Sequence, residues 1–246
     1  FGYSSMVYAT AAIAFLSFVV WAHHMFTVGM PIAGELYFMY ATMLIAVPTG
    51  VKVFNWITTM YKGSLTFETP MLFSIAFVIL FTFGGFTGLM LSIAAADMQY
   101  HDTYFVVAHF HYVMVAGAVF SGTAAIYYWL PKWCGKMYNE TMGQVQFWVA
   151  FIGFNIAFMP QHFLGLAGMP RRYADYGLQF ADWNMVSSIG AFIYGGAQLM
   201  LLYNVIMTIR NGKPTTEEKT WEGAEGLEWT VPSPAPYHTF ATPPEL

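Results

Sequence analysis

The histidines are the residues best suited to chemistry, and five of the seven fall into two short groups. The first group is the adjacent pair His23 and His24, which closes an apolar run. Neighbouring residues on a helix point about 100° apart, so two adjacent imidazoles reach one metal only where the helix ends or is distorted. Imidazole suits copper, iron and zinc. The pair is a candidate metal site, although two interfacial histidines that cap a span are, taken alone, the simpler interpretation.

The second group contains His101, His109 and His111, and the last two are separated by Phe110 within another apolar run. Residues two apart on a helix point about 200° apart, so these imidazoles face opposite sides and cannot bind the same metal. The alternative is a pair of hydrogen-bonded core histidines. Polar residues within a membrane are costly, which favours a functional role. The spacing predicts two separate cofactors, one on each side of the helix, with Phe110 between them.

His101 and Asp102 lie just before this run, in a short polar stretch. An imidazole and a carboxylate near the surface fit a hard divalent ion such as magnesium or manganese, with water in the remaining positions. Two ligands are too few for a closed site. The dipeptide by itself predicts at most an open metal site.

Lys52 is the only formal charge inside the apolar stretches. A charge at the centre of a membrane helix costs about 2.5–3.5 kcal/mol on insertion scales. Thr42, Thr49 and Thr59 share a broad helical face with it, and Pro48 should loosen the backbone nearby. This pattern predicts a proton path in which the lysine changes its charge. The alternative, in which Lys52 reaches the membrane surface, requires it to cross about nine residues of helix.

Arg171 and Arg172 follow a Gly-Met-Pro turn between two apolar stretches. Arginine forms bidentate pairs with carboxylates and phosphates, so the two residues need anionic partners. Haem propionates and lipid phosphates both qualify. Asp97, in a neighbouring polar stretch, could share a proton or a hydrogen bond with such a propionate.

The composition defines the elements that must position these residues. Hydrophobic residues make up 57% of the chain and charged residues 9%, against about 25% charged in soluble proteins. A water-exposed surface cannot be built from so few charges, and disorder is excluded by the same figures. A net charge of −4 excludes a nucleic-acid binder, and the single Cys134 excludes a disulfide framework and a cysteine zinc site. The chain is therefore an integral membrane protein.

Six stretches are long and apolar enough to span a bilayer, which requires about 20 residues each. They are Tyr3–Ala22, Tyr37–Tyr61, Pro70–Ile93, Thr103–Leu130, Gly143–Leu166 and Asn184–Ile209. These predict an all-α membrane domain over residues 1–210. Residues 211–246 carry six acids and two lysines without an apolar period, which predicts an extended, solvent-exposed tail.

The distribution of lysine and arginine predicts the orientation. With both termini inside, the inside segments hold six cationic residues, and the outside loops hold only Arg171 and Arg172. The inside residues are Lys62, Lys132, Lys136, Arg210, Lys213 and Lys219. The chain begins at Phe1 without a charged segment ahead of its first apolar run, so we expect part of a longer protein or a processed product rather than a signal peptide.

Several motifs, in order, resemble subunit I of the haem-copper oxidases, and the resemblance runs through all six stretches into the tail. The motifs are the segments 20–25 (VWAHHM), 48–54 (PTGVKVF), 100–104 (YHDTY), 107–112 (VAHFHY), 162–165 (HFLG), 168–172 (GMPRR) and 227–234 (LEWTVPSP). The last of these is similar to the cytochrome c oxidase branch, and the bacterial aa3 type is the most similar group.

The resemblance implies a role for each histidine in the two groups. His23 and His24 would be two of three ligands of the copper ion, copper B. His109 would be the axial ligand of haem a3, and His111 an axial ligand of haem a, with Phe110 between the haems. The resemblance also implies three further groups of functional residues. His101 and Asp102 would bind magnesium or manganese, and Arg171 and Arg172, with Asp97 nearby, would bind the haem propionates. Thr49 and Lys52 would form part of a proton pathway.

The departure from the family is one of length. Subunit I of this family has twelve spans, and this chain resembles only the last six. The third copper ligand with its cross-linked tyrosine, the second haem a ligand and a membrane glutamate have no counterpart here, so the chain would be half of a catalytic subunit, naturally split or cut.

The resemblance implies a proton-pumping enzyme of the bacterial inner membrane that reduces dioxygen with electrons from cytochrome c, and both termini of this chain would be cytoplasmic. Its partners would be the N-terminal half of subunit I, subunit II with copper A, subunit III and membrane lipid, with no nucleic acid. A quinol oxidase of the same superfamily is the first alternative. Half of a transporter with Lys52 as its coupling residue is the second, but it leaves the opposed histidines without a purpose.

Overall fold

The computed structural model describes residues 1–215 and 220–244 of the chain. The helices are α1 (Tyr3–Ser17), α2 (Ile32–Leu44), α3 (Ala46–Met60), α4 (Thr69–Ser92), α5 (Ala94–Tyr100), α6 (Tyr104–Met114), α7 (Ser121–Cys134), α8 (Glu140–Leu166) and α9 (Ala181–Asn211). Short 3₁₀ segments occupy Trp21–Val28, Leu178–Phe180 and Leu227–Thr230, and a π-helical turn, Val115–Phe120, joins α6 to α7. Two-residue strands β1 (Lys136–Met137) and β2 (Lys213–Pro214) pair antiparallel.

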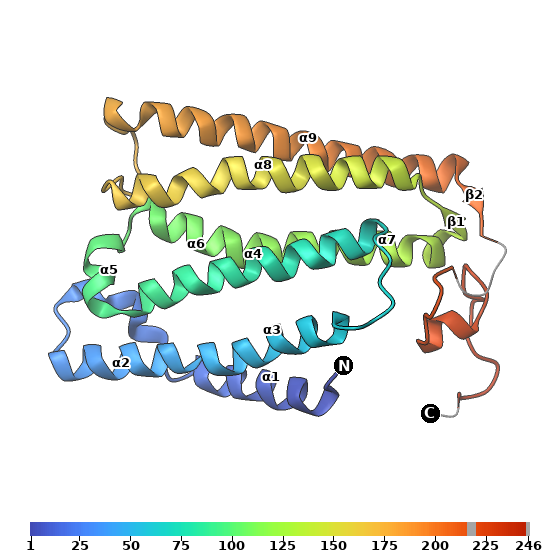
Figure 1. Cartoon of the computed structure of the whole chain (residues 1–246), viewed down its shortest axis with the longest axis horizontal. Coiled ribbons are helices and arrows are strands. Elements are labelled where there is room, and N and C mark those ends of the chain that lie inside the picture. The colour runs from blue at the N-terminus through green and yellow to red at the C-terminus, as the bar shows by residue number, and fades with distance from the viewer. Residues whose placement is uncertain (216–219, 245–246) are drawn as a thin grey trace.

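Within the described residues these elements form six helical segments long and apolar enough to cross a membrane, as the sequence predicts. They are Tyr3–Val28, Ile32–Met60, Thr69–Ser92, Tyr104–Cys134, Glu140–Leu166 and Leu178–Asn211. Figure 1 shows them running along one common direction, with the N- and C-termini at the same end of the bundle. The chain is a multi-pass, all-α membrane protein.

Three of the predicted spans are not continuous α-helices, and one of them is the fourth, in which the π-helical turn Val115–Phe120 separates α6 from α7. The first ends as an α-helix at Ser17 and continues as a 3₁₀ segment whose Met25 has non-helical dihedral angles. The second is interrupted at Ile45, between α2 and α3. Pro48 lies in the first turn of α3, where its missing N–H cannot bond to the carbonyl four residues earlier. These interruptions lie beside the residues singled out for chemistry.

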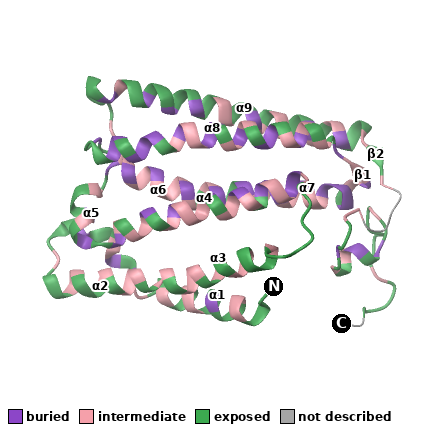
Figure 2. Cartoon of the chain, in the orientation of Figure 1, coloured by how far each residue is buried: buried purple, intermediate pink, exposed green. Residues whose placement is uncertain are grey.

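The core lies between α4, α7, α8 and α9, where aromatic side chains fill the space between the helices. Phe73 packs edge-on against Phe147, with ring centroids 5.1 Å apart, and also contacts Phe120 and Tyr127. Figure 2 shows the buried residues concentrated on α4, α6, α7 and α8, whereas α1 has Ala9 as its single buried residue and α2 and α3 have none. Exposed apolar faces of this extent are expected where a helix contacts lipid or another subunit.

Glycines allow α8 and α9 to approach closely along their length (Figure 1). A Cβ atom at Gly190 of α9 would lie 2.2 Å from the backbone nitrogen of Ala157 of α8. A Cβ atom at Gly153 of α8 would lie 2.7 Å from the backbone nitrogen of Tyr194. The close approach packs α9 directly on α8, which in turn contacts α6.

Part of the tail, within residues 220–232, is less exposed than its composition predicts. Trp229 is 1% exposed, and its ring packs edge-on against Tyr128 of α7. The Trp221 indole donates to the Tyr128 carbonyl at 2.8 Å, and the Lys132 ammonium donates to the carbonyls of Val231 and Pro232. The tail therefore packs on the end of α7. Lys219, one of the cationic residues used to predict the orientation, lies outside the described residues.

Candidate functional site

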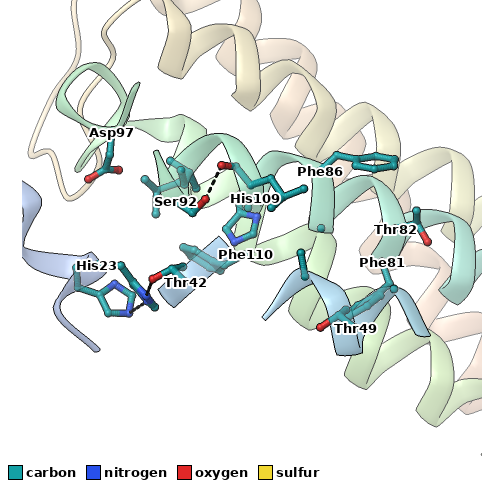
Figure 3. A pocket seen from close by; sticks show the side chains of 18 of the residues that line it. His23, Thr42, Thr49, Phe81, Thr82, Phe86, Ser92, Asp97, His109 and Phe110 are labelled. Atoms are coloured by element: carbon teal, nitrogen blue, oxygen red, sulfur yellow. Dashed lines mark hydrogen bonds between the residues drawn. The ribbon is translucent and has the colours of Figure 1, made fainter. Parts of the chain in front are cut away.

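A cavity of about 1010 Å³ lies between the 3₁₀ segment after α1, helices α2 to α6 and the loop after α8 (Figure 3). Its size is at the upper end of small-molecule and cofactor sites, about 300–1,000 Å³. Ten of the predicted site residues line it: His23, His24, Thr49, Asp97, His101, Asp102, His109, Phe110, Arg171 and Arg172. His111 and Lys52 are not among its lining residues.

His23 and His24 meet because the helix changes its geometry at this point. Both lie in the 3₁₀ segment, and their Nε2 atoms are 3.0 Å apart. Two nitrogens at this separation can bind one ion at roughly 2.0–2.1 Å each, the usual metal–imidazole distance. The other ring nitrogen of His23 lies 3.1 Å from the Thr42 hydroxyl, which leaves Nε2 for a metal. The donor set and its separation fit a copper ion.

His109 points into the cavity from the opposite wall (Figure 3). Its Nδ1 atom lies 2.9 Å from the carbonyl oxygen of Gly84 and 3.0 Å from the hydroxyl oxygen of Thr87, both on α4. A carbonyl only accepts, so Nδ1 carries the proton and Nε2 keeps its lone pair for a metal. This is the arrangement expected of an axial ligand of a haem iron.

His111 occupies different surroundings, as the two-residue spacing predicts. Its Nδ1 atom lies 2.7 Å from the Val107 carbonyl, and its ring stacks on Phe158 of α8 at 4.1 Å. Phe110 lines the cavity that contains His109 and also stacks on His111 at 4.6 Å. The two imidazoles therefore serve different spaces, and Phe110 contacts both.

The polar end of the cavity is built from two loops that are joined by backbone hydrogen bonds. The amide of Arg171 donates to the Asp102 carbonyl at 2.8 Å, and the amide of Tyr104 donates to the Met169 carbonyl at 3.0 Å. The guanidinium of Arg171 lies 3.5 Å from the Asp102 carboxylate. Together with Arg172 this loop places two cationic side chains at the cavity.

Asp97 lies at the same end, in α5, and is almost fully buried. Burial raises the pKa of the Asp97 carboxyl, and the nearby His101 ring, 3.3 Å away, opposes part of that rise. A carboxyl of this kind can hold a proton and donate it to an anionic group.

The cavity combines an apolar wall with a cationic end and a protruding imidazole. The apolar wall includes Val53, Phe54, Phe81, Phe86 and Leu89. An apolar macrocycle that carries carboxylates would fit these surroundings, and the arginines and His109 would be the residues that hold it. The residues present therefore fit a haem group.

The residues present supply fewer ligands for a magnesium or manganese ion than a complete site needs. The two ring nitrogens of His101 face Asp97 and Asp102, at 3.3 and 3.5 Å. Among the described residues, no three histidine, cysteine or acidic side chains form a metal-binding cluster. The site offers the two ligands that the sequence indicates, and an ion there needs water or another chain to complete its shell.

The threonines around Lys52 each have a hydrogen-bond partner of their own. Thr49 lines the cavity and donates to the Ile45 carbonyl at 2.8 Å, and Thr59 donates to the Asn55 carbonyl at 2.6 Å. The Lys52 ammonium lies 5.8 Å from the centre of the Trp56 ring. The Thr42 hydroxyl lies 3.1 Å from Nδ1 of His23. The proton path predicted from the spacing of these residues stays a prediction, and Lys52 lies in the middle of α3.

Sequence reasoning missed Thr87, Gly84 and Gly88, which surround the His109 ring. A Cβ atom at Gly88 would lie 2.8 Å from Cε1 of His109. These residues lie in an apolar helix without any charged or metal-binding side chain, so no sequence signal distinguishes them. Their importance depends on contact between two spans.

Comparisons with known proteins decide the family. The sequence matches the family described as Cytochrome C and Quinol oxidase polypeptide I over residues 1–193. The chain belongs to this family. Membership leaves the transporter alternative without support and implies haem and copper cofactors in general terms.

Individual members of the cytochrome c and quinol oxidase family are highly similar. The chain is 54% identical to cytochrome c oxidase subunit 1 of Cereibacter sphaeroides over its whole length, and 55% identical to that of Bacillus sp. (strain PS3) over 99% of its length. It covers only 44% and 40% of these two relatives, in their C-terminal portions.

A chain from the cryo-EM structure of a heme-copper terminal oxidase dimer has the same fold. Its TM-score is 0.73 at 20% identity, with 83% of this chain and 42% of that chain covered. At 20% identity, this likeness supports the fold alone.

Proposed function

We propose that this chain is the C-terminal part of the catalytic core of a cytochrome c oxidase, which reduces dioxygen to water with electrons from cytochrome c and pumps protons. The observation that carries the proposal is the opposition of His109 to the His23–His24 pair across one cavity. High identity to cytochrome c oxidase subunits 1 supports cytochrome c as the donor. Because the chain covers less than half of those relatives, activity requires the remainder of subunit I, and we propose subunits II, with copper A, and III as further partners.

Each residue at the cavity has a proposed task. His23 and His24 hold copper B, His109 holds the iron of haem a3, and His111 holds the iron of haem a on the far side of α6. Phe110 contacts both spaces and packs between them. When bound, the haems and copper supply electron transfer and the reduction of dioxygen.

The polar end of the cavity has a binding task rather than a redox one. Arg171 and Arg172 pair with haem propionates, since guanidinium groups bind carboxylates in a bidentate manner. Asp97 donates a hydrogen bond to a propionate when its carboxyl is protonated. His101 and Asp102 hold a magnesium or manganese ion with water.

Proton supply is the proposed task of Lys52 and Thr49. Dioxygen reduction consumes a proton for each electron, so the buried centre needs a route from water. Lys52 lies in the middle of α3 and Thr49, one turn earlier, lines the cavity. The amine takes up a proton from the side of the termini, which we propose is the cytoplasm of a bacterium, and passes it towards Thr49.

A reduced-minus-oxidised visible spectrum of the purified complex tests the proposal. Bands of a-type haem together with oxidation of cytochrome c support it. Bands of b- or o-type haem with quinol oxidation favour the quinol oxidase alternative, and the absence of haem bands contradicts both.

A further inference from the structure

Thr87 links α4 to the His109 ring through a closed set of three short contacts. Its hydroxyl oxygen lies 3.0 Å from Nδ1 of His109 and 2.8 Å from the Gly84 carbonyl oxygen. The same carbonyl lies 2.9 Å from Nδ1 of His109. Three polar atoms from two spans therefore meet at one point beside the ring.

The chemistry of the three groups fixes where the protons lie. The Gly84 carbonyl can only accept, so the Nδ1–H of His109 and the hydroxyl proton of Thr87 are both directed to it. The Thr87 oxygen then offers its lone pair to the same Nδ1–H, which is shared between two acceptors. Nε2 of His109 is left without a proton, as a metal ligand must be.

Packing holds this arrangement in place. Thr87 is 6% exposed, and its branched side chain has few rotamers. Gly88, the next residue, leaves room for the ring, because a Cβ atom there would lie 2.8 Å from Cε1 of His109. The imidazole is therefore confined by a hydroxyl on one edge and by a side-chain-free position on α4.

A simpler account is that Thr87 only bonds to its own helix. Threonines in apolar helices commonly donate to a carbonyl three or four residues earlier. Thr82, on the same helix and lining the same cavity, does so with the Val78 carbonyl at 2.7 Å. Thr87 differs because its oxygen also lies within hydrogen-bond distance of an imidazole. Thr82 is thus a matched control for the helix bond alone.

We propose that Thr87 is a positioning residue for His109. It fixes the orientation and protonation of the ring and, as a hydrogen-bond acceptor, makes Nε2 a more basic ligand. This inference rests on the proposed role of His109 as the axial ligand of haem a3. It assigns a positioning role to a residue of α4, a helix that supplies none of the proposed metal ligands.

The test is the iron–histidine stretching band in the resonance Raman spectrum of the reduced, purified complex. The isosteric Thr87→Val removes the hydroxyl and keeps the volume, Thr87→Ser keeps the hydroxyl, and Thr82→Val removes a helix-bonded hydroxyl elsewhere. Haem content is measured in each. We expect a lower band frequency in Thr87→Val with haem content retained, recovery in Thr87→Ser, and no change in Thr82→Val.

Other outcomes contradict the inference. An unchanged band in Thr87→Val, or an equal shift in Thr82→Val, would show that the hydroxyl has only a helix-bonding role. Should Thr87→Val fail to assemble, Thr87→Ala is measured by the same criteria. A wild-type complex without any high-spin haem band would overturn the proposed function itself. Failure of the Thr87 role alone would leave that band in the wild type, so the two failures can be distinguished.

Discussion

His109 and His111 lie two residues apart on α6, yet His109 lines the large cavity and His111 stacks on Phe158 of α8. The opposition follows from helix geometry, because residues two apart point about 200° from each other. The ring nitrogen Nδ1 is occupied in both, by Gly84 and by Val107. Each imidazole thus presents Nε2 to a different space, which is the basis for the proposal that one short helix serves two cofactors.

Substitution of His23 or His24 with alanine should remove copper B and leave haem content nearly unchanged. Each ring supplies one of two nitrogens only 3.0 Å apart, so neither can replace the other. Metal analysis of the purified complex measures both quantities. His238→Ala, in the exposed part of the tail, is the matched control and should keep its copper. Full copper content in the His23 or His24 variants would contradict the copper site and would indicate that the two histidines have only an interfacial role.

Asp102→Ala should abolish a manganese site at the polar end of the cavity. The carboxylate is one of only two ligands that the dipeptide supplies, and its loss leaves a single imidazole. In cells grown with manganese, electron paramagnetic resonance should show a bound Mn(II) signal in the wild type and none in the variant. Asp175→Ala, in the exposed loop after Arg172, should keep the signal. Persistence in Asp102→Ala would place the ion elsewhere.

Lys52→Met should lower steady-state oxidase activity by roughly a hundredfold, the lower range for loss of a proton-transfer group. Methionine keeps the apolar volume of the side chain, so haem spectra should remain intact. Stopped-flow reduction should slow far more for haem a3 than for haem a. Lys62→Met, just beyond the end of α3, is the control and should behave as wild type. Near-normal turnover in Lys52→Met would remove the proton-path role.

Trp229→Ala should release the tail from α7. Loss of a buried indole costs about 3–5 kcal/mol, and here it also removes the ring beneath the Lys132 ammonium, 5.6 Å from its centre. Hydrogen exchange of peptides covering residues 220–232 should accelerate, while exchange in α8 stays slow. Tyr237 provides the control, since its side chain is 97% exposed and Tyr237→Ala removes no buried packing. Unchanged exchange in Trp229→Ala would mean that the tail is held by other contacts.

The sequence predicts the parts of this structure that depend on local rules. Hydropathy indicates six spans, and the 100° step between residues separates His109 from His111. The adjacency of His23 and His24 indicates a helix end, which the 3₁₀ segment supplies. Each of these inferences needs only one segment of the chain.

The features that were not predicted depend on contacts between segments. The Thr42 hydroxyl lies 3.1 Å from the ring of His23, which is 19 positions away in sequence. The packing of Trp229 against Tyr128 joins a segment without apolar periodicity to a distant helix end. Thr87 reaches His109 from another span, 22 positions away in sequence. Composition and periodicity do not contain this information.

The most direct test of the account is the pair of substitutions His109→Asn and His111→Asn, compared by reduced-minus-oxidised spectra of the purified complex. We predict that His109→Asn removes the ligand-binding, high-spin haem signal and abolishes turnover, while low-spin haem absorbance remains. His111→Asn should instead remove the low-spin signal. If both substitutions erased the same band, the two imidazoles would serve one cofactor, and the two-sided arrangement proposed for α6 would be wrong.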